Sequence, residues 1–296
     1  MPTLYDRAES NTRKTWLLIF LFLIFVIAAG YLFSYLLDSY FILVLAVLLS
    51  ITMSFSSYWY SDRIVLKMNK AQEVEKDDYP ELYRVVENLC ITSGLPQPDV
   101  YILKSKQPNA FATGRDPEHA VVVATTGLLD KLEREELEGV IAHELSHIGN
   151  RDILLQTAVV VLVGIVALLS RLFLRISFFS DNNKGGTILM LLGIGAAILA
   201  PIAASVIRLA ISRKREFLAD ADGALLTRYP EGLASALEKI SQDQHEMKEA
   251  RNSTAHLFIN NPFKGKKKKS FFTRLFMTHP PVEERIKKLR DMNIES

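Results

Sequence analysis

Four long runs of apolar residues dominate the hydropathy pattern of this chain. The first two, 16–37 and 40–60, contain no charged residue, and each is long enough to cross a hydrocarbon layer of about 30 Å. Only Asp38 and Ser39 separate them, which predicts a tight transmembrane hairpin. The first run is longer than a signal-peptide core, has no clear small-residue cleavage site and leads directly into the second, so we expect it to be retained.

The third and fourth runs, 153–170 and 187–207, form a second uncharged pair joined by a loop at 171–186. Their length and lack of charge predict a second transmembrane hairpin, with Gln156 and Thr157 near one end. A pair of long helices buried in a protein core is the alternative, because apolar runs near the lower length limit occur there as well.

Shorter patterns between and after these runs predict a small α+β unit. An amphipathic helix is expected at 79–95, closed by Gly94 with prolines just beyond. Three short segments rich in strand-forming residues should form an antiparallel sheet: 99–105, 109–114 and 120–125. Its edge could pair with an extended peptide, although a plain core sheet has the same pattern. Helical patterns recur at 132–150, 212–226, 232–244 and 282–292.

The helix expected at 132–150 contains two histidines that bracket a glutamate, namely His143, Glu144 and His147. At about 100° per residue the two imidazoles lie about 40° apart on one face, where both can reach one metal ion. Neutral imidazoles are good zinc ligands, and Glu144 can approach a metal-bound water and take its proton. This predicts peptide hydrolysis without a covalent intermediate. The pattern also arises by chance in roughly one per cent of chains this long, so it needs a third ligand.

The third ligand must come from an acid or another histidine, because the single cysteine, Cys90, lies in an apolar helical stretch and is expected in the core. Glu216 and Asp220 are four residues apart in the helix expected at 212–226. Glu216 could complete a His2Glu site with an open position for water, and Asp220 could bond a ligand imidazole. A solvated acidic face paired with Arg213, Lys214 and Arg215 is the alternative, and spacing alone does not decide between them.

The distribution of basic residues predicts which side of the membrane carries the site. His147 precedes the third run and Glu216 follows the fourth, so one metal can hold both only if the chain crosses the bilayer an even number of times between them. The turn of the first hairpin has no Lys or Arg, and that of the second has Arg171, Arg175 and Lys184. Basic residues flank the other ends of the runs, at Arg7, Arg13, Lys14, Arg63, Lys67, Lys70, Arg213, Lys214 and Arg215. We therefore expect both termini and both halves of the site in the cytoplasm.

Composition agrees with a membrane protein and argues against nucleic-acid binding. The 296 residues are 49% hydrophobic with a mean hydropathy of +0.15, which is high for a soluble protein. The net charge is only +2, and no recognition pattern accompanies the lysines. Five lysines within 264–269, followed by Phe271, Phe272 and Phe276, could rest on anionic lipid, whereas a solvated loop is the plainer interpretation.

Four motifs in order along the chain resemble the HtpX-type membrane metalloproteases of the heat-shock protease HtpX family, relatives of the CAAX prenyl endopeptidases. They are "PNAFATG…AVVVATTGLL", "AHELSHIGNRD", "SRKREFLADADGA" and "THPPVEERIKKL". The resemblance implies a gluzincin-type zinc endopeptidase in protein quality control, part of the stress response. Position by position it implies one Zn²⁺ per chain on His143, His147 and Glu216, with Glu144 as general base and Asp220 bonding a ligand.

Two further residues are weaker candidates. His279 could donate a hydrogen bond to the oxyanion formed during attack, or could simply anchor the loop before the last helix. Asn109 could bond the substrate backbone beside the sheet edge. His119, His245 and His256 lie in polar contexts with no motif around them.

Together these patterns predict a mainly α membrane protein with four transmembrane helices in two hairpins and a cytoplasmic α+β gluzincin-type zinc protease domain. We expect a tail and first hairpin at 1–60, a second hairpin at 153–210, and a catalytic domain split between 61–152 and 211–296. The expected partners are the lipid bilayer and membrane-protein substrates. The alternatives are a non-catalytic membrane scaffold with a vestigial metal site, which has no need of an unligated Glu144, and a zinc enzyme that hydrolyses something other than a peptide.

Overall fold

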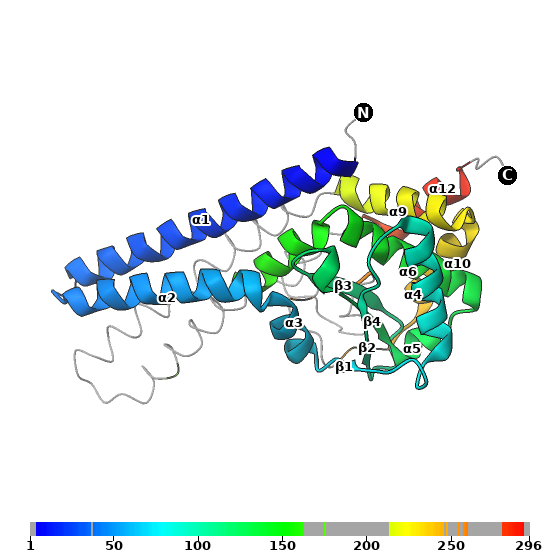
Figure 1. The fold of residues 1–296 in the computed structure, drawn as a ribbon, viewed down its shortest axis with the longest axis horizontal. Coiled ribbons are helices and arrows are strands. Elements are labelled where there is room, and N and C mark those ends of the chain that lie inside the picture. The colour runs from blue at the N-terminus through cyan, green and yellow to red at the C-terminus, as the bar shows by residue number, and fades with distance from the viewer. Residues whose placement is uncertain are drawn as a thin grey trace.

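The structure is a computed structural model, and it describes residues 4–36, 38–162, 175, 213–245, 247, 254, 257–259 and 280–292. Two long helices form a hairpin that projects from a domain built around a small sheet (Figure 1). The helices of the described part are α1 (Leu4–Leu36), α2 (Tyr40–Trp59), α3 (Ser61–Asn69), α4 (Pro80–Ser93), α5 (Thr126–Leu129), α6 (Arg134–Gly149), α9 (Arg213–Thr227), α10 (Pro230–Gln242) and α12 (Val282–Arg290), with an apolar helix Asp152–Leu162 after α6.

The first predicted hairpin is confirmed as a pair of helices, α1 and α2, which turn at Asp38 with a φ of 46°. The segment Ala8–Ala28 of α1 is long and apolar enough to cross a membrane. Large apolar side chains on α1 face outward, with Trp16 and Phe20 more than half exposed. In α2, Leu43–Trp59 continues into α3 through an 80° bend, so that the described residues contain one membrane-crossing helix, or two if this bent pair is counted.

The second predicted hairpin falls largely outside the described residues. The structure describes its run 153–170 only as far as Leu162, in the helix Asp152–Leu162, whose residues are buried against the domain. The Thr157 hydroxyl lies 3.0 Å from the Thr113 hydroxyl, which joins this helix to the sheet. The run 187–207 and the Lys-rich segment 264–269 lie outside the described part.

Four strands form one sheet in the order β1-β2-β4-β3, with β1 (Gln72–Glu73), β2 (Asp99–Leu103), β3 (Ala110–Gly114) and β4 (Ala120–Thr125). The three predicted strands are confirmed, but the prediction of an antiparallel sheet is wrong, because β2 and β4 pair in parallel. After β2 the chain does not form the neighbouring strand but crosses to the edge of the sheet, where it forms β3. It then turns back and forms β4 in the space between β2 and β3. A strand inserted in this way runs parallel to β2 and antiparallel to β3.

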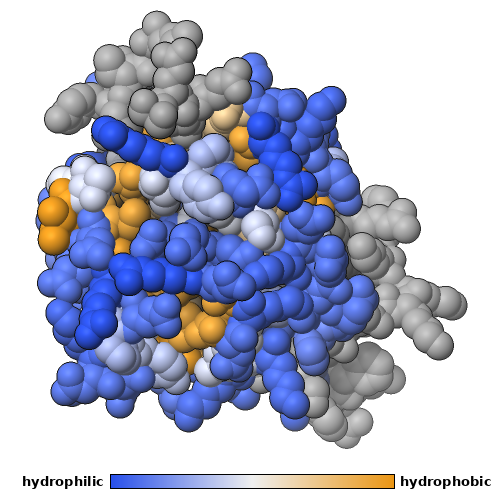
Figure 2. All heavy atoms as spheres, turned by 90° about the vertical axis from the view of Figure 1, so that its right-hand side faces the viewer, coloured by the Kyte–Doolittle hydropathy of each residue, from blue (hydrophilic) through white to orange (hydrophobic). Residues whose placement is uncertain are grey.

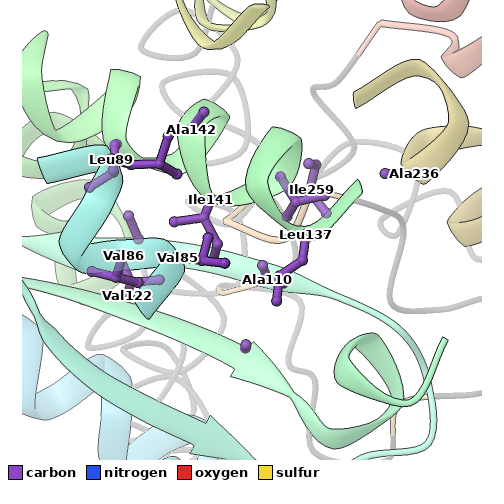
Figure 3. Close-up of a cluster of buried hydrophobic side chains, with 14 of the residues drawn as sticks. Val85, Val86, Leu89, Ala110, Val122, Leu137, Ile141, Ala142, Ala236 and Ile259 are labelled. Atoms are coloured by element: carbon purple, nitrogen blue, oxygen red, sulfur yellow. The ribbon is translucent and has the colours of Figure 1, made fainter. Parts of the chain in front are cut away.

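Each face of the sheet is covered by apolar side chains. On one face, α4 and α6 pack over the strands with Val85, Val86, Ile141 and Val122 at their contact (Figure 3). On the other face, Phe111 meets the ring of Phe258 edge-on, with centroids 5.0 Å apart. The metal-motif helix α6, which carries His143, Glu144 and His147, packs directly against the edge strand β3.

The two ends of the molecule differ in surface character. Apolar side chains are exposed along the α1–α2 hairpin, whereas the opposite end of the molecule is mostly hydrophilic (Figure 2). Arg115, which follows β3, lies over the Trp59 ring at 5.0 Å and donates to the Trp59 carbonyl oxygen. This contact joins the edge of the sheet to the domain end of the hairpin.

Candidate metal centre

Helices α6 and α9 bring three potential metal ligands together. His143 and His147 come from α6 and Glu216 from the first turn of α9, and one ligand atom from each lies within 4.8 Å of the others. The Nε2 atoms of the two histidines are 3.8 Å and 3.6 Å from the Glu216 carboxylate oxygens. All three side chains are buried, and so is Asp220, so the acidic pair Glu216 and Asp220 of α9 is not a solvated face.

The sequence of α6 explains how this helix is held in place. Its first turn is a capping box in which Glu133 and Glu136 bond each other's backbone N–H groups. Glu136 also accepts hydrogen bonds from Ser235 at 2.6 Å and Lys239 at 2.8 Å, both on α10. Burial alone would raise the pKa of Glu136, but these hydrogen bonds outweigh it and lower the pKa. The start of the metal-motif helix is therefore anchored by a charged contact.

The His143 nitrogen that points away from Glu216, Nδ1, is oriented by the ion pair of Asp220 and Arg285. This Nδ1 lies 3.0 Å from Asp220. Arg285 of α12 donates two hydrogen bonds to the same carboxylate, from Nε at 2.9 Å and from Nη2 at 2.6 Å. Burial alone would raise the pKa of Asp220, but the Arg285 charge and the hydrogen bonds lower it to about 2. Asp220 is therefore a carboxylate that fixes which His143 nitrogen faces Glu216.

The outer nitrogen of His147 has an equivalent partner in Asp152, at 3.1 Å. Arg215 donates to the other oxygen of Asp152 at 2.8 Å. Burial alone would lower the pKa of His147, but the hydrogen bond with Asp152 and the negative charges of Glu216, Asp152 and Glu144 raise it to about 9. The negative field that favours an imidazolium here would equally favour a metal cation.

Glu144 is buried beside the ligands but belongs to no ligand group. The backbone N–H of Ala112 in β3 donates to its carboxylate. Burial raises the pKa of Glu144 and the charge of Glu216 adds to this, against the opposing effect of the two histidines and the Ala112 bond. The strand edge thus orients a carboxylate whose proton affinity is increased, as a general base requires.

The donor set fits zinc. Two imidazole nitrogens and one carboxylate are a catalytic zinc set that leaves one position open. Each imidazole is backed by a carboxylate on its other nitrogen, at 3.0 Å and 3.1 Å, which is the usual environment of zinc-binding histidines. His143, His147 and Glu216 would therefore be the ligands of the ion.

The described part of the chain places no other sequence candidate in the ligand group. Asn109 is fully buried, and its backbone N–H and carbonyl bond Thr125, so its role as a substrate contact stays a prediction. His279 lies outside the described residues. His119 and His245 are bonded to Asp116 and Asp243, apart from the ligand group.

Sequence reasoning missed Asp152 and Arg285. Asp152 is the last residue of the motif "HIGNRD", five residues after His147. An acidic residue so close to a candidate ligand could have been recognised from the sequence as a partner for its imidazole. Arg285 lies on the buried side of α12 with Leu289, four residues further on. A basic residue on an apolar helix stripe signals a buried ion pair, but nothing local identifies its partner.

This fold and site define a metallopeptidase, and comparison with known proteins agrees. Residues 76–293 match the sequence model of peptidase family M48. The chain belongs to this family, and the prediction of an HtpX-type metalloprotease is confirmed by its relatives.

The relatives match along almost the whole chain. The protease HtpX homologue of Dictyoglomus thermophilum is 46% identical over 293 residues, covering 98% of this chain and 95% of the relative. That of Pyrococcus furiosus is 49% identical over 258 residues, covering 86% and 87%. The crystal structure of S. mikatae Ste24p aligns with 93% of this chain and 66% of that one, at 20% identity and a TM-score of 0.49.

Proposed function

We propose that this protein is a membrane-bound zinc endopeptidase that cleaves misfolded or damaged membrane proteins. The observation that carries the proposal is the convergence of His143, His147 and Glu216 within 4.8 Å, with an oriented, unligated Glu144 beside them. A scaffold with a vestigial metal site would not need this fourth buried residue, a carboxylate outside the ligand group.

The proposed chemistry divides among the residues of the site. A zinc ion on the three ligands would polarise a water molecule and lower its pKa. The Glu144 carboxylate takes the proton from the attacking water and returns it to the leaving amine. Ala112 holds this carboxylate through its backbone N–H, while Asp220 and Asp152 hold the imidazoles.

The edge of β3 supports a peptide as the substrate. The Asn109 carbonyl accepts a hydrogen bond from the N–H of Thr125 in β4. Residues of an antiparallel strand alternate, so Ala110, Ala112 and Gly114 direct their backbone groups away from β4, toward the edge of the sheet. The N–H of Ile259 already occupies the Ala110 carbonyl at 3.1 Å. The Ala112 N–H bonds Glu144, so we place an extended substrate along the Ala112 carbonyl and Gly114, next to Glu144.

The exposed apolar hairpin supports a membrane location beside this site. We propose a multi-pass protein of the cytoplasmic (inner) membrane with four crossings and the active site in the cytoplasm. The even-crossing requirement between His147 and Glu216 and the basic residues that flank the runs favour this orientation. Substrates would then be membrane proteins or their damaged cytoplasmic ends.

Metal analysis tests the proposed site. Protein purified in detergent should contain about one zinc per chain, because two histidines and a glutamate form a complete catalytic set. Glu216→Ala should lose stable zinc binding, whereas Glu138→Gln, a change at a partly exposed position of α6 that pairs with Arg134, should retain it. Unchanged zinc in Glu216→Ala would place the third ligand elsewhere.

A further inference from the structure

A polar contact joins the membrane-hairpin helix α1 to the metal centre. The amide nitrogen of Asn11 donates to the Asn150 carbonyl at 2.8 Å and to Asp152 Oδ1 at 2.8 Å. Asn11 is only 4% exposed and lies near the start of α1, before the uncharged run 16–37. The contact spans about 140 positions of sequence and ends on the residue that bonds His147.

The orientation of the Asn11 amide follows from its partners. A carbonyl and a carboxylate are both acceptors, so the amide must present its NH2 group, and the two N–H bonds of that group match the two acceptors. Asn150 is the C-cap residue directly after α6, and its own side chain bonds Ser146 and Asp222. Asn11 therefore holds both the end of the metal-motif helix and the carboxylate that follows it.

Asp152 connects Asn11 to the metal centre, because it bonds both Asn11 and His147. One of its carboxylate oxygens accepts hydrogen bonds from Asn11 and Arg215, each at 2.8 Å, and the other oxygen lies 3.1 Å from His147 Nδ1. With one oxygen fixed by two donors, the carboxylate has little freedom to rotate. The second oxygen then fixes the tautomer and the ring plane of His147.

We propose that Asn11 is a positioning residue of the metal centre, through which helix α1 sets the orientation of His147. The inference rests on the proposed zinc function. It makes the geometry of the site depend on how the membrane hairpin is seated against the domain. Residues that orient a metal ligand typically change metal affinity about 10- to 100-fold when they are lost.

Thr15 provides the matched control. It is fully buried on the same helix, four residues after Asn11, but among the described residues its hydroxyl bonds the Asn11 carbonyl within α1. Thr15→Val removes a buried polar group without touching Asp152. If Asn11 acted only by packing α1 against the domain, the two substitutions would have similar effects.

The test compares Asn11→Leu and Thr15→Val in the full chain in detergent. Zinc affinity is measured by competition with a chelator, and ligand geometry by the absorption spectrum of the Co²⁺-substituted protein. Asn11→Leu should bind zinc about 10- to 100-fold more weakly with an altered Co²⁺ spectrum, and Thr15→Val should match the wild type. Wild-type affinity and spectrum in Asn11→Leu, or an equal loss in Thr15→Val, would overturn the inference.

Two further variants keep the test informative. Should Asn11→Leu not fold, Asn11→Ser retains one donor and should bind zinc with intermediate affinity, and unchanged affinity there would again overturn the inference. Adding Asn11→Leu to Asp152→Asn should cause little further loss, because both act on His147, whereas fully additive losses would refute a shared route. A wild-type protein that binds no zinc would instead contradict the proposed function itself.

Discussion

Arg285 brings a positive charge into the core, where it is 1% exposed and paired with Asp220. Removing one partner of a buried pair leaves the other as an uncompensated charge. Arg285→Met should therefore lower the free energy of unfolding by about 3–5 kcal/mol. It should also weaken zinc binding, since Asp220 would no longer be held against His143.

The control for this prediction is Arg290→Met on the same helix. Arg290 bonds Glu231 and Glu238 at the surface, where its side chain is 44% exposed. Denaturant unfolding in detergent should show a far smaller effect for this change. Equal destabilisation by the two substitutions would mean that the burial of the Arg285–Asp220 pair is unimportant.

At the scale of residues, the sequence predicted those site residues that lie within a few positions of one another on the same helix. His143 and His147 share a helix, as do Glu216 and Asp220, so periodicity was enough to place each pair on one face. Asn11 and Arg285 could not be found in this way. Their partners are 141 and 65 residues away, and only the packing of whole helices brings them together.

At the scale of elements, the approach of α6 to α10 depends on Gly139. A Cβ atom at this position would lie 2.6 Å from the backbone nitrogen of Leu233 and 2.8 Å from its Cα. Gly139→Ala should force the helices apart and destabilise the protein by about 1–3 kcal/mol, although alanine favours a helix.

Gly149→Ala, at the end of the same helix, is the matched comparison. A Cβ there would meet only the Leu95 side chain at 3.6 Å, an ordinary contact. Its unfolding free energy should be unchanged or slightly higher. If Gly139→Ala proved equally harmless in the same unfolding measurement, α10 would not pack on α6 as closely as described.

Periodicity was also sufficient for five of the described helices, α4, α6, α9, α10 and α12, but it did not predict α3. It did not give the sheet order, because strand patterns specify which residues face the core and not which strand lies beside which. The path of residues 104–109 decides that β4 lies between β2 and β3, and this stretch carries no pattern that reveals its path.

At the scale of the whole molecule, the α1–α2 hairpin exposes apolar side chains and the opposite end is mostly hydrophilic (Figures 1 and 2), as the proposed membrane location requires. A topology reporter after Ser296 and another inserted near the exposed Lys76 should both report cytoplasm, and one within 181–186 should report the far side. A cytoplasmic signal from 181–186 would mean that the second apolar pair does not span. That result would still be compatible with the metal centre, because His147 and Glu216 lie on the same side of the membrane when the chain between them makes no crossing.

The central claim, a zinc-dependent hydrolase with Glu144 as its base, is tested most directly by Glu144→Gln. The amide is nearly isosteric and lies outside the ligand group, so the variant should fold, enter the membrane and retain zinc. Its turnover of an unfolded membrane-protein substrate in detergent should fall about 10²- to 10⁴-fold relative to zinc-loaded wild type. A zinc-replete Glu144→Gln protein that cleaves this substrate at close to the wild-type rate would contradict the account.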